Sequence, residues 1–181
     1  MSDADRLRWD RRYADRVPGE PEDAALPAVF APHAAEFPVT GSALELACGR
    51  GAAAVWLALR GMEVRGVDVS PAAIDAAREL ARRCGVAARC HFDVVDLDGG
   101  LPAGPIVDVL LCNRFRDSLL DGAIVERLAP GGLLALSALS EVGGRPGPYR
   151  VRAGELTDAF ATLGVVACGE ADGLAWLLAR R

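Results

Sequence analysis

The stretch "LELACGRGAAAVWLALRG", residues 44–61, joins two apolar runs through a tight turn that contains two glycines. The first run predicts a buried strand, and the second predicts a helix that is apolar on almost every face and must be covered on both sides. Gly49 and Gly51 permit a positive φ or a close approach of the backbone to a ligand. The turn therefore has two interpretations, a plain strand-to-helix connection and a ligand-binding loop.

Composition limits the partners that this loop could serve. The chain has 181 residues, of which 51% are apolar and 25% charged, as expected for one globular domain. A net charge of −5 without long basic runs argues against nucleic acid as a partner. The N-terminus is charged, and no run approaches the ~20 apolar residues that span a bilayer. We expect a cytoplasmic monomer or homodimer with no membrane partner.

Cysteine and histidine usage gives no sign of a metal centre. The five cysteines form no C-x-x-C pair, and the chain has only two histidines. Neither a disulfide framework nor a zinc site is indicated by that spacing. We therefore predict that most of the cysteines are small buried residues in a reducing cytosol, and we expect no metal site.

Strand and helix patterns alternate along the core. Ser70, Pro71 and Gly85 are typical of the start and the end of a helix. The connection between the last two strands is only about four residues, which is too short for a parallel crossover, so this pair must be antiparallel. Helices are predicted at 52–60, 71–84 and 153–163, and strands at 42–47, 62–69, 88–95, 106–113, 131–139, 165–170 and 174–181.

This alternation predicts an α/β fold, a doubly wound, mostly parallel sheet with helices on both faces. We expect a single domain over residues 1–181, in which residues 41–181 form the core. Residues 1–40 contain a polar helical pattern at about 4–16 and a Pro-rich stretch with a possible short helix near 28–36. They are expected to form a helical cap over the core.

Two carboxylates flank the glycine turn and indicate the kind of ligand. In open parallel sheets, ligands bind beyond the carboxyl ends of the strands. Asp68 ends the second strand, where it could accept hydrogen bonds from two ribose hydroxyls; its alternative role, a cap for the next helix, is already filled by Ser70. Glu45 precedes the turn, and a carboxylate suits an ammonium group and repels a pyrophosphate. The residues favour a nucleoside with an amino-acid end.

Successive segments of the chain resemble the motifs of the class I S-adenosylmethionine-dependent methyltransferases. The segments are "ALELACGRG", "VRGVDVS", "FDVVDLD", "VDVLLCN" and "LAPGGLLAL". The resemblance implies a seven-stranded Rossmann-like sheet in the order 3-2-1-4-5-7-6 with the last strand antiparallel. "WDRRY", residues 9–13, is similar to the opening of the small methyltransferases grouped with tellurite-resistance and thiopurine enzymes. Ala47 stands where the family usually has Gly, a change that should be tolerated if the φ there is negative.

The resemblance also implies which residues contact S-adenosylmethionine, the expected cofactor, and its product S-adenosylhomocysteine. Glu45 would hold the ammonium group, directly or through water, and Asp68 would accept the ribose hydroxyls. Asp96 would accept the adenine amino group, although Asp93 or Asp98 could take that place. The full expected set is Trp9, Glu45, Ala47, Gly49, Gly51, Asp68, Val69, Asp96, Leu97 and Asn113.

The acceptor side is less defined. The segment "CNRFRDS", residues 112–118, follows the fourth strand, where such enzymes keep groups that face the substrate, and it lacks the N-P-P-Y type sequence found where exocyclic amines and glutamine are methylated. Arg114 or Arg116 could bind an anion. The alternative is a helix that begins near Asp117, with its arginines in solvent.

The N-terminal aromatic residues leave a similar choice. Trp9, Arg12 and Tyr13 would form a lid that excludes water from the site, or they would belong to a helix that packs on the sheet edge. Tyr13 joins Arg114, Arg116 and Asp117 as a substrate-side candidate, and no catalytic residue is identified.

We expect in-line methyl transfer to a small molecule, for which alignment supplies most of the acceleration. A protein that binds the cofactor without catalysis is the alternative, and a nicotinamide-dependent reductase is a more distant one.

Overall fold

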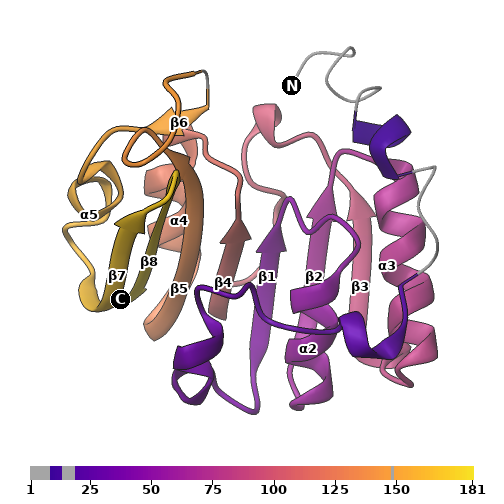
Figure 1. Ribbon diagram of the computed structural model, residues 1–181. Coiled ribbons are helices and arrows are strands. Elements are labelled where there is room, and N and C mark those ends of the chain that lie inside the picture. The colour runs from indigo at the N-terminus through magenta and orange to yellow at the C-terminus, as the bar shows by residue number, and fades with distance from the viewer. Residues whose placement is uncertain (1–8, 14–18, 148) are drawn as a thin grey trace. The chain divides into compact units, whose positions relative to one another are not determined.

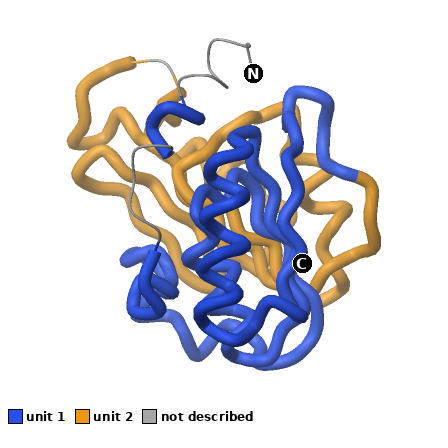
Figure 2. Tube along the Cα trace, turned by 90° about the vertical axis from the view of Figure 1, so that its right-hand side faces the viewer, with its two compact units in different colours: residues 1–102 blue, residues 103–181 orange. Residues whose placement is uncertain are grey.

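The computed structural model describes residues 9–13, 19–147 and 149–181. These residues divide into two compact units, residues 1–102 and 103–181, which Figure 2 colours separately. Of the predicted N-terminal helix, only residues 9–13 lie within the described residues, and they are helical.

The first unit is built on three parallel strands in the order β3-β2-β1, which lie side by side in Figure 1. Their registers bring Leu46 beside Val67 and Val67 beside Asp93. The strands are β1 (Ser42–Leu46), β2 (Glu63–Asp68) and β3 (Cys90–Val94), and the helices are α2 (Ala52–Leu59), α3 (Pro71–Arg83), η1 (Pro21–Asp23), η2 (Ala31–Glu36), η3 (Ala87–Arg89) and η4 (Leu97–Gly99). Because the strands are parallel, the loops that follow them meet at one edge.

Local sequence signals account for the boundaries of α3. Ser70 is its N-cap, and the Ser70 hydroxyl accepts a hydrogen bond of 3.2 Å from the Ala73 backbone N–H. Pro71 occupies the first helical position, where no intrahelical N–H bond is lost. Gly85 follows the helix with φ of +71°, the left-handed conformation usual for a residue just past a helix end. The predicted start and end of this helix are confirmed.

The Pro-rich segment after residue 18 is packed into the first unit. Phe30 and Phe37 are fully buried, and the Phe37 ring meets the Trp56 ring of α2 edge to face, with centroids 5.8 Å apart. The Arg60 guanidinium lies over the Trp56 ring, 4.7 Å from its centroid, and donates to the Phe37 carbonyl. The helix predicted near 28–36 is the 3-10 helix η2, which is interrupted at His33.

The second unit contains the strands in the order β4-β5-β8-β7, with β6 beside β5. β4 and β5 are parallel, and β8 is antiparallel to β5. β7 and β8 are also antiparallel, as their short connection predicts. The strands are β4 (Val107–Asn113), β5 (Leu128–Ser140), β6 (Arg150–Val151), β7 (Gly164–Ala171) and β8 (Leu174–Arg180), and the helices are η5 (Ser118–Leu120), α4 (Asp121–Arg127) and α5 (Glu155–Ala159).

Three elements of the second unit differ from the sequence prediction. β5 begins at Leu128, because the "LAPGG" stretch pairs with β4 through a bulge between Val107 and Val109. The two-residue strand β6 was not predicted, since it is too short for any alternation to show. The helix α5 is only five residues long, about half of its predicted length.

The turn between β7 and β8 is as tight as a hairpin permits. Only Asp172 and Gly173 connect the strands, with φ of +52° and +76°. Two-residue hairpins of this kind need positive φ at both positions, which Asp-Gly accommodates well.

Candidate functional site

The loop after β1 is left-handed at alternate residues. The φ angles of Ala47, Gly49 and Gly51 are +49°, +53° and +75°, and the loop is closed by a hydrogen bond of 2.9 Å from Gly51 N–H to the Cys48 carbonyl. Cys48 N–H also donates to the Val67 carbonyl of β2. The sequence analysis expected alanine to be tolerated at position 47 if its φ were negative, and that condition is not met. Ala47 adopts a left-handed conformation that costs an L-residue roughly 1–2 kcal/mol.

Replacing Ala47 by glycine is expected to stabilise the protein by up to about 1 kcal/mol. Glycine removes the left-handed penalty of roughly 1–2 kcal/mol, and its greater chain entropy returns about 0.5–1 kcal/mol to the unfolded state. The free energy of unfolding from urea denaturation measures the effect. Ala76→Gly, in the interior of α3, is the matched control and should destabilise by about 1 kcal/mol. Equal losses for both variants would contradict the left-handed assignment.

The two glycines of the loop serve different purposes. A Cβ atom at Gly49 would lie 3.0 Å from the Tyr13 hydroxyl, so this position lets a side chain from residues 9–13 approach the backbone. A Cβ atom at Gly51 would lie 2.8 Å from the Ala77 Cβ and 3.1 Å from the Phe92 ring. Gly51 thus also has a packing role, because it lets α3 and β3 pack closely against the start of α2.

Asp68 lies at the end of β2 with both carboxylate oxygens engaged by the backbone. One oxygen accepts from Gly49 N–H at 2.8 Å, and the other accepts from Ser70 N–H at 2.9 Å. Asp68 is only 6% exposed. Burial raises its pKa, and the hydrogen bonds from the Ser70, Gly49 and Val69 backbone oppose that rise. Each oxygen keeps a further lone pair, so the carboxylate can hold the loop and still accept ligand hydroxyls.

Glu45 is a buried acid at the base of the same loop. It is 3% exposed, and one carboxylate oxygen accepts from Ala54 N–H of α2 at 2.8 Å. Its pKa is raised to about 8, mainly by burial; the bond from Ala54 lowers it, and the nearby charge of Asp68 raises it. A buried acid with a raised pKa beside a second carboxylate is the arrangement that a cationic ligand would stabilise in its charged form.

Of the three candidate aspartates, Asp93 lies within β3, whereas Asp96 and Asp98 lie in the loop that follows it. The Asp93 side chain accepts from Arg65 Nε at 2.8 Å, and both side chains are substantially exposed. Asp96 caps the 3-10 helix η4 by accepting from Asp98 N–H at 3.0 Å. Val69, directly after β2, and Leu97, the first residue of η4, are both buried, at 6% and 3% exposure.

Residues 9–13 lie against these loops. The Trp9 and Tyr13 rings stack with centroids 6.1 Å apart, and the Arg12 guanidinium lies 5.2 Å from the Trp9 ring centroid. Asp10 accepts from the Ser70 hydroxyl at 2.8 Å and from Ala72 N–H at 3.0 Å. The segment has features of both alternatives. It is bonded to the start of α3, as a packing helix would be, and Tyr13 lies close to Gly49, as a residue of a lid would.

In the second unit, Asn113 ends β4 and is held by a buried serine. The fully buried Ser137 of β5 donates its hydroxyl to the Asn113 side-chain oxygen at 2.7 Å. Arg114 N–H donates to both the Ser137 hydroxyl and its carbonyl, at 3.0 and 2.9 Å. Arg114 itself is exposed and has φ of +57°, a strained conformation of the kind that gathers at functional sites.

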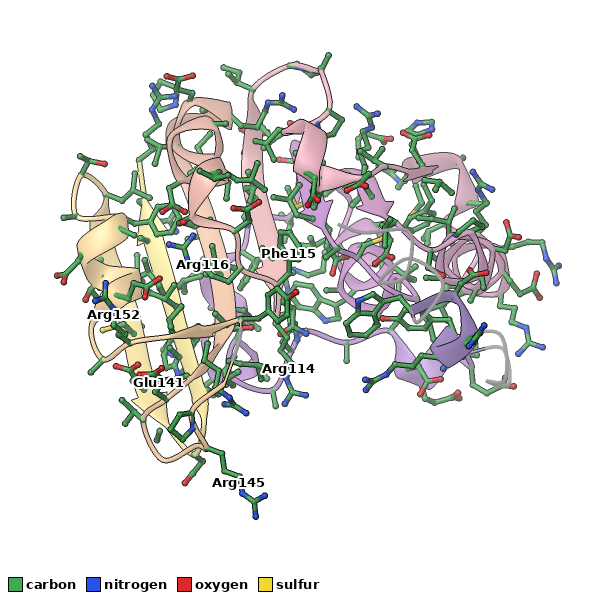
Figure 3. All side chains as sticks on the ribbon, turned by 90° about the horizontal axis from the view of Figure 1, so that it is seen from above. Arg114, Phe115, Arg116, Glu141, Arg145 and Arg152 are labelled. Carbon is green, nitrogen blue, oxygen red and sulfur yellow. The ribbon has the colours of Figure 1, made fainter. Side chains whose placement is uncertain are left out.

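Arg116 and Asp117 are bound to other groups of the protein, whereas the Arg114 side chain is exposed. Arg116 is 7% exposed; it pairs with Asp121 through two bonds of 2.5 and 2.9 Å, and it lies 3.6 Å from Glu155. Figure 3 shows Arg114 and Arg116 lying apart. Asp117 caps η5 by accepting from Leu119 N–H. The alternative of a helix start at Asp117 thus describes its position, whereas Arg116 is ion-paired and not in solvent.

Three functional candidates were missed by sequence reasoning: Asp10, Gly66 and Ser137. A Cβ atom at Gly66 would lie 2.7 Å from the Phe92 ring and 3.1 Å from the Cys48 sulfur, so this glycine makes room beneath the loop. A glycine inside a strand is a signal of such close approach. Asp10 lies in the "WDRRY" segment, but neither its role nor that of Ser137 could be predicted, because their partners are far away in sequence.

The cysteines and the acidic groups show no metal centre within the described ranges. All five cysteines are free thiols; three are buried as predicted, whereas Cys84 is half-buried and Cys168 is exposed. Burial raises the pKa of Cys48 well above its ordinary value. No group of three or more potential metal ligands occurs among the described residues. In the same part of the chain, no helix is both long and apolar enough to cross a membrane.

Comparison with known proteins identifies the class to which these loops belong. Residues 43–132 match a family model described as a methyltransferase domain. This match assigns about half of the chain, the part that contains the loops after β1, β2 and β3, to a methyltransferase domain.

The curated relatives are named for different methyl acceptors. The ribosomal protein L11 methyltransferase of Dechloromonas aromatica is 37% identical over 99 residues, which are 53% of this chain and 31% of the relative. The 2-heptyl-1-hydroxyquinolin-4(1H)-one methyltransferase of Mycobacteroides abscessus is 32% identical over 132 residues, 66% of this chain and 57% of the relative. The chain spans about a third of the length of the curated relatives that it matches first.

The solved structure of TehB from Haemophilus influenzae matches 96% of this chain and 67% of its own, with a TM-score of 0.76 at 17% identity. This likeness confirms the predicted fold class, a Rossmann-like, mostly parallel sheet with helices and an antiparallel last strand. At that identity it shows the fold alone.

Proposed function

We propose that this protein is an S-adenosylmethionine-dependent methyltransferase that acts on a small-molecule acceptor. The observation that carries the proposal is the pair of buried carboxylates, Glu45 and Asp68, at the two sides of the left-handed loop. Their placement suits a ligand that is cationic at one end and carries vicinal hydroxyls at the other. A dinucleotide would bring a pyrophosphate to the same loop, where the Asp68 carboxylate would repel it and the protonated Glu45 would offer it no cation.

The donor and acceptor set of the first unit fits S-adenosylmethionine. Glu45 would hold the ammonium group and Asp68 the ribose hydroxyls, while the backbone of 47–51 would lie along the methionine end. Buried Val69 and Leu97 would cover the adenine, with Asp96 accepting its amino group. Trp9 completes the proposed contacts of this unit, and the family resemblance adds Asn113 of the second unit to the expected set.

The bound cofactor supplies a methyl group activated by a sulfonium centre. Displacement at that carbon is accelerated chiefly by holding the acceptor atom in line and close. The residues proposed here bind, orient and shield from water; Trp9 and Tyr13 supply apolar cover at the loop. Asn113, whose side-chain oxygen is occupied by Ser137, would keep its amide N–H groups for a ligand.

Arg114 is the better candidate for holding an anionic acceptor. The charge of Arg116 is compensated by Asp121 and Glu155, whereas Arg114 is exposed at the end of β4. A small-molecule acceptor is supported by the quinolone methyltransferase among the relatives and by the acidic net charge. The relative named for ribosomal protein L11 makes a protein acceptor the outcome that a broad assay must be able to detect.

Turnover of cofactor labelled in its methyl group tests the function. The panel should contain thiols, chalcogen anions, phenols, N-hydroxy heterocycles and carboxylates, together with ribosomal protein and RNA. We expect label to appear on at least one small molecule and S-adenosylhomocysteine to form in equal amount. Tight cofactor binding with no product on any acceptor would favour a non-catalytic binding protein, and label on ribosomal protein or RNA alone would overturn the acceptor class.

Arg114→Gly is expected to raise the KM for an anionic acceptor about tenfold or more, the loss of one charge-assisted hydrogen bond. Glycine removes the guanidinium and also relieves the positive φ, so the fold should not suffer. Steady-state kinetics with saturating cofactor measure the KM, and calorimetry should show unchanged affinity for S-adenosylhomocysteine. The exposed Arg152→Ala is the matched control. An unchanged KM in Arg114→Gly would remove Arg114 from the acceptor site.

A further inference from the structure

We infer that Asp10 is a positioning residue that couples residues 9–13 to the Asp68 carboxylate. The Asp10 side chain accepts two hydrogen bonds through one oxygen, from the Ser70 hydroxyl at 2.8 Å and from Ala72 N–H at 3.0 Å. It thereby reaches the N-terminus of α3, about 60 residues further along the chain. The role of Asp10 in ligand release rests on the proposed function, but its role in holding residues 9–13 does not.

Ser70 is the junction through which Asp10 acts. It is fully buried, and its hydroxyl oxygen accepts from Ala73 N–H while its single hydroxyl proton goes to Asp10. The backbone N–H of the same residue donates to Asp68 at 2.9 Å. Asp10 therefore binds the side chain of the residue whose backbone N–H holds one oxygen of Asp68.

The other oxygen of Asp68 is held by a residue that the same segment covers. Gly49 N–H donates to it at 2.8 Å, and the Tyr13 hydroxyl lies 3.0 Å from the position that a Gly49 Cβ would take. Residues 9–13 thus contact the two residues whose backbone N–H groups hold Asp68: Asp10 contacts Ser70, and Tyr13 contacts Gly49. Tyr13 also stacks on Trp9, which precedes Asp10 in the chain.

This arrangement does more than cap a helix. Ser70 already caps α3, and Pro71 offers no N–H, so Asp10 adds only the bond to Ala72 within the first turn. What Asp10 adds beyond that bond is the attachment of residues 9–13 beside Asp68. A ligand held by Asp68 would depend on the hydrogen bonds from Gly49 and Ser70 that hold this carboxylate. Without the Asp10 attachment, residues 9–13 would move away from these groups more readily, and the ligand would dissociate faster.

Three variants test the inference. Asp10→Ala removes the acceptor, Asp10→Asn keeps an oxygen that can accept both bonds, and Asp75→Ala removes a carboxylate of the same helix that pairs with Arg78 on the surface. Stopped-flow displacement gives the dissociation rate of S-adenosylhomocysteine, and hydrogen exchange reports on residues 9–13 with and without this ligand. We expect roughly tenfold faster dissociation in Asp10→Ala, the equivalent of one lost hydrogen bond, and rates near wild type in the other two.

Hydrogen exchange separates this inference from the proposed function. In the ligand-free protein, Asp10→Ala should expose residues 9–13 to faster exchange than Asp75→Ala does. Equal exchange and equal dissociation in those two variants would overturn the inference, as would Asp10→Asn dissociating as fast as Asp10→Ala. If the wild-type protein does not bind S-adenosylhomocysteine at all, the proposed function fails, and the exchange comparison alone decides the role of Asp10.

Discussion

Glu45→Gln is expected to make the ligand-free protein more stable at pH 8 than the wild type, while weakening cofactor binding at least tenfold. Burial raises the pKa of Glu45 to about 8 from an ordinary value of 4.5. Between these two values the unfolded chain has lost a proton that the folded chain retains. The contribution of Glu45 to stability is therefore fully present below about pH 4.5 and falls as the pH rises to about 8.

Glutamine does not titrate, and its side-chain oxygen can still accept the bond from Ala54 N–H. The difference in the free energy of unfolding between Glu45→Gln and wild type should grow from pH 5 to pH 8 by an amount on the order of 3–5 kcal/mol. Urea denaturation at several pH values measures it. A difference that stays constant with pH would show that Glu45 is ionised in the folded protein.

The same carboxyl group predicts proton release when the cofactor binds. At pH 7, Glu45 is mostly protonated in the free protein, and an ammonium group beside it would favour the ionised form. Calorimetry in two buffers of different ionisation enthalpy should show nearly one proton released per cofactor in the wild type and none in Glu45→Gln. Equal proton release in both would place the ammonium group away from Glu45.

Asp68→Asn is expected to weaken cofactor binding by about 10- to 100-fold, corresponding to roughly 1.5–3 kcal/mol for lost charge-assisted hydrogen bonds. Asparagine keeps only one acceptor oxygen for the two N–H groups of Gly49 and Ser70, so a small loss of stability should accompany the effect. Asp68→Ala removes both acceptors and leaves two buried donors unpaired, and it should cost more stability.

Calorimetric titration with S-adenosylhomocysteine measures the affinity, and thermal unfolding confirms that each variant is folded. Asp93→Asn is the matched control, because it lies on the neighbouring strand and pairs with Arg65. Its affinity should equal that of the wild type. A folded Asp68→Asn protein with unchanged affinity would refute the proposed ribose contact.

Much of the architecture was predictable because its signals are local. Ser70, Pro71 and Gly85 set the start and end of α3 within a few residues of the groups that they satisfy. The tight Asp172-Gly173 connection requires an antiparallel pair of strands whatever the rest of the chain does. β6 and the bulge in β5 escaped prediction, because pairing there depends on distant backbone and not on any pattern in the strand itself.

For the site, the sequence by itself determined which chemical groups are present: carboxylates before and after a glycine turn, an asparagine at a strand end and arginines beyond it. Tertiary structure alone decided what they do. It made Ala47 left-handed, raised the pKa of Glu45 by burying it, and neutralised Arg116 with Asp121. It also joined Asp10 to Ser70. The reason is physical: residue identity sets the donors and charges, whereas burial and long-range contacts set their energies.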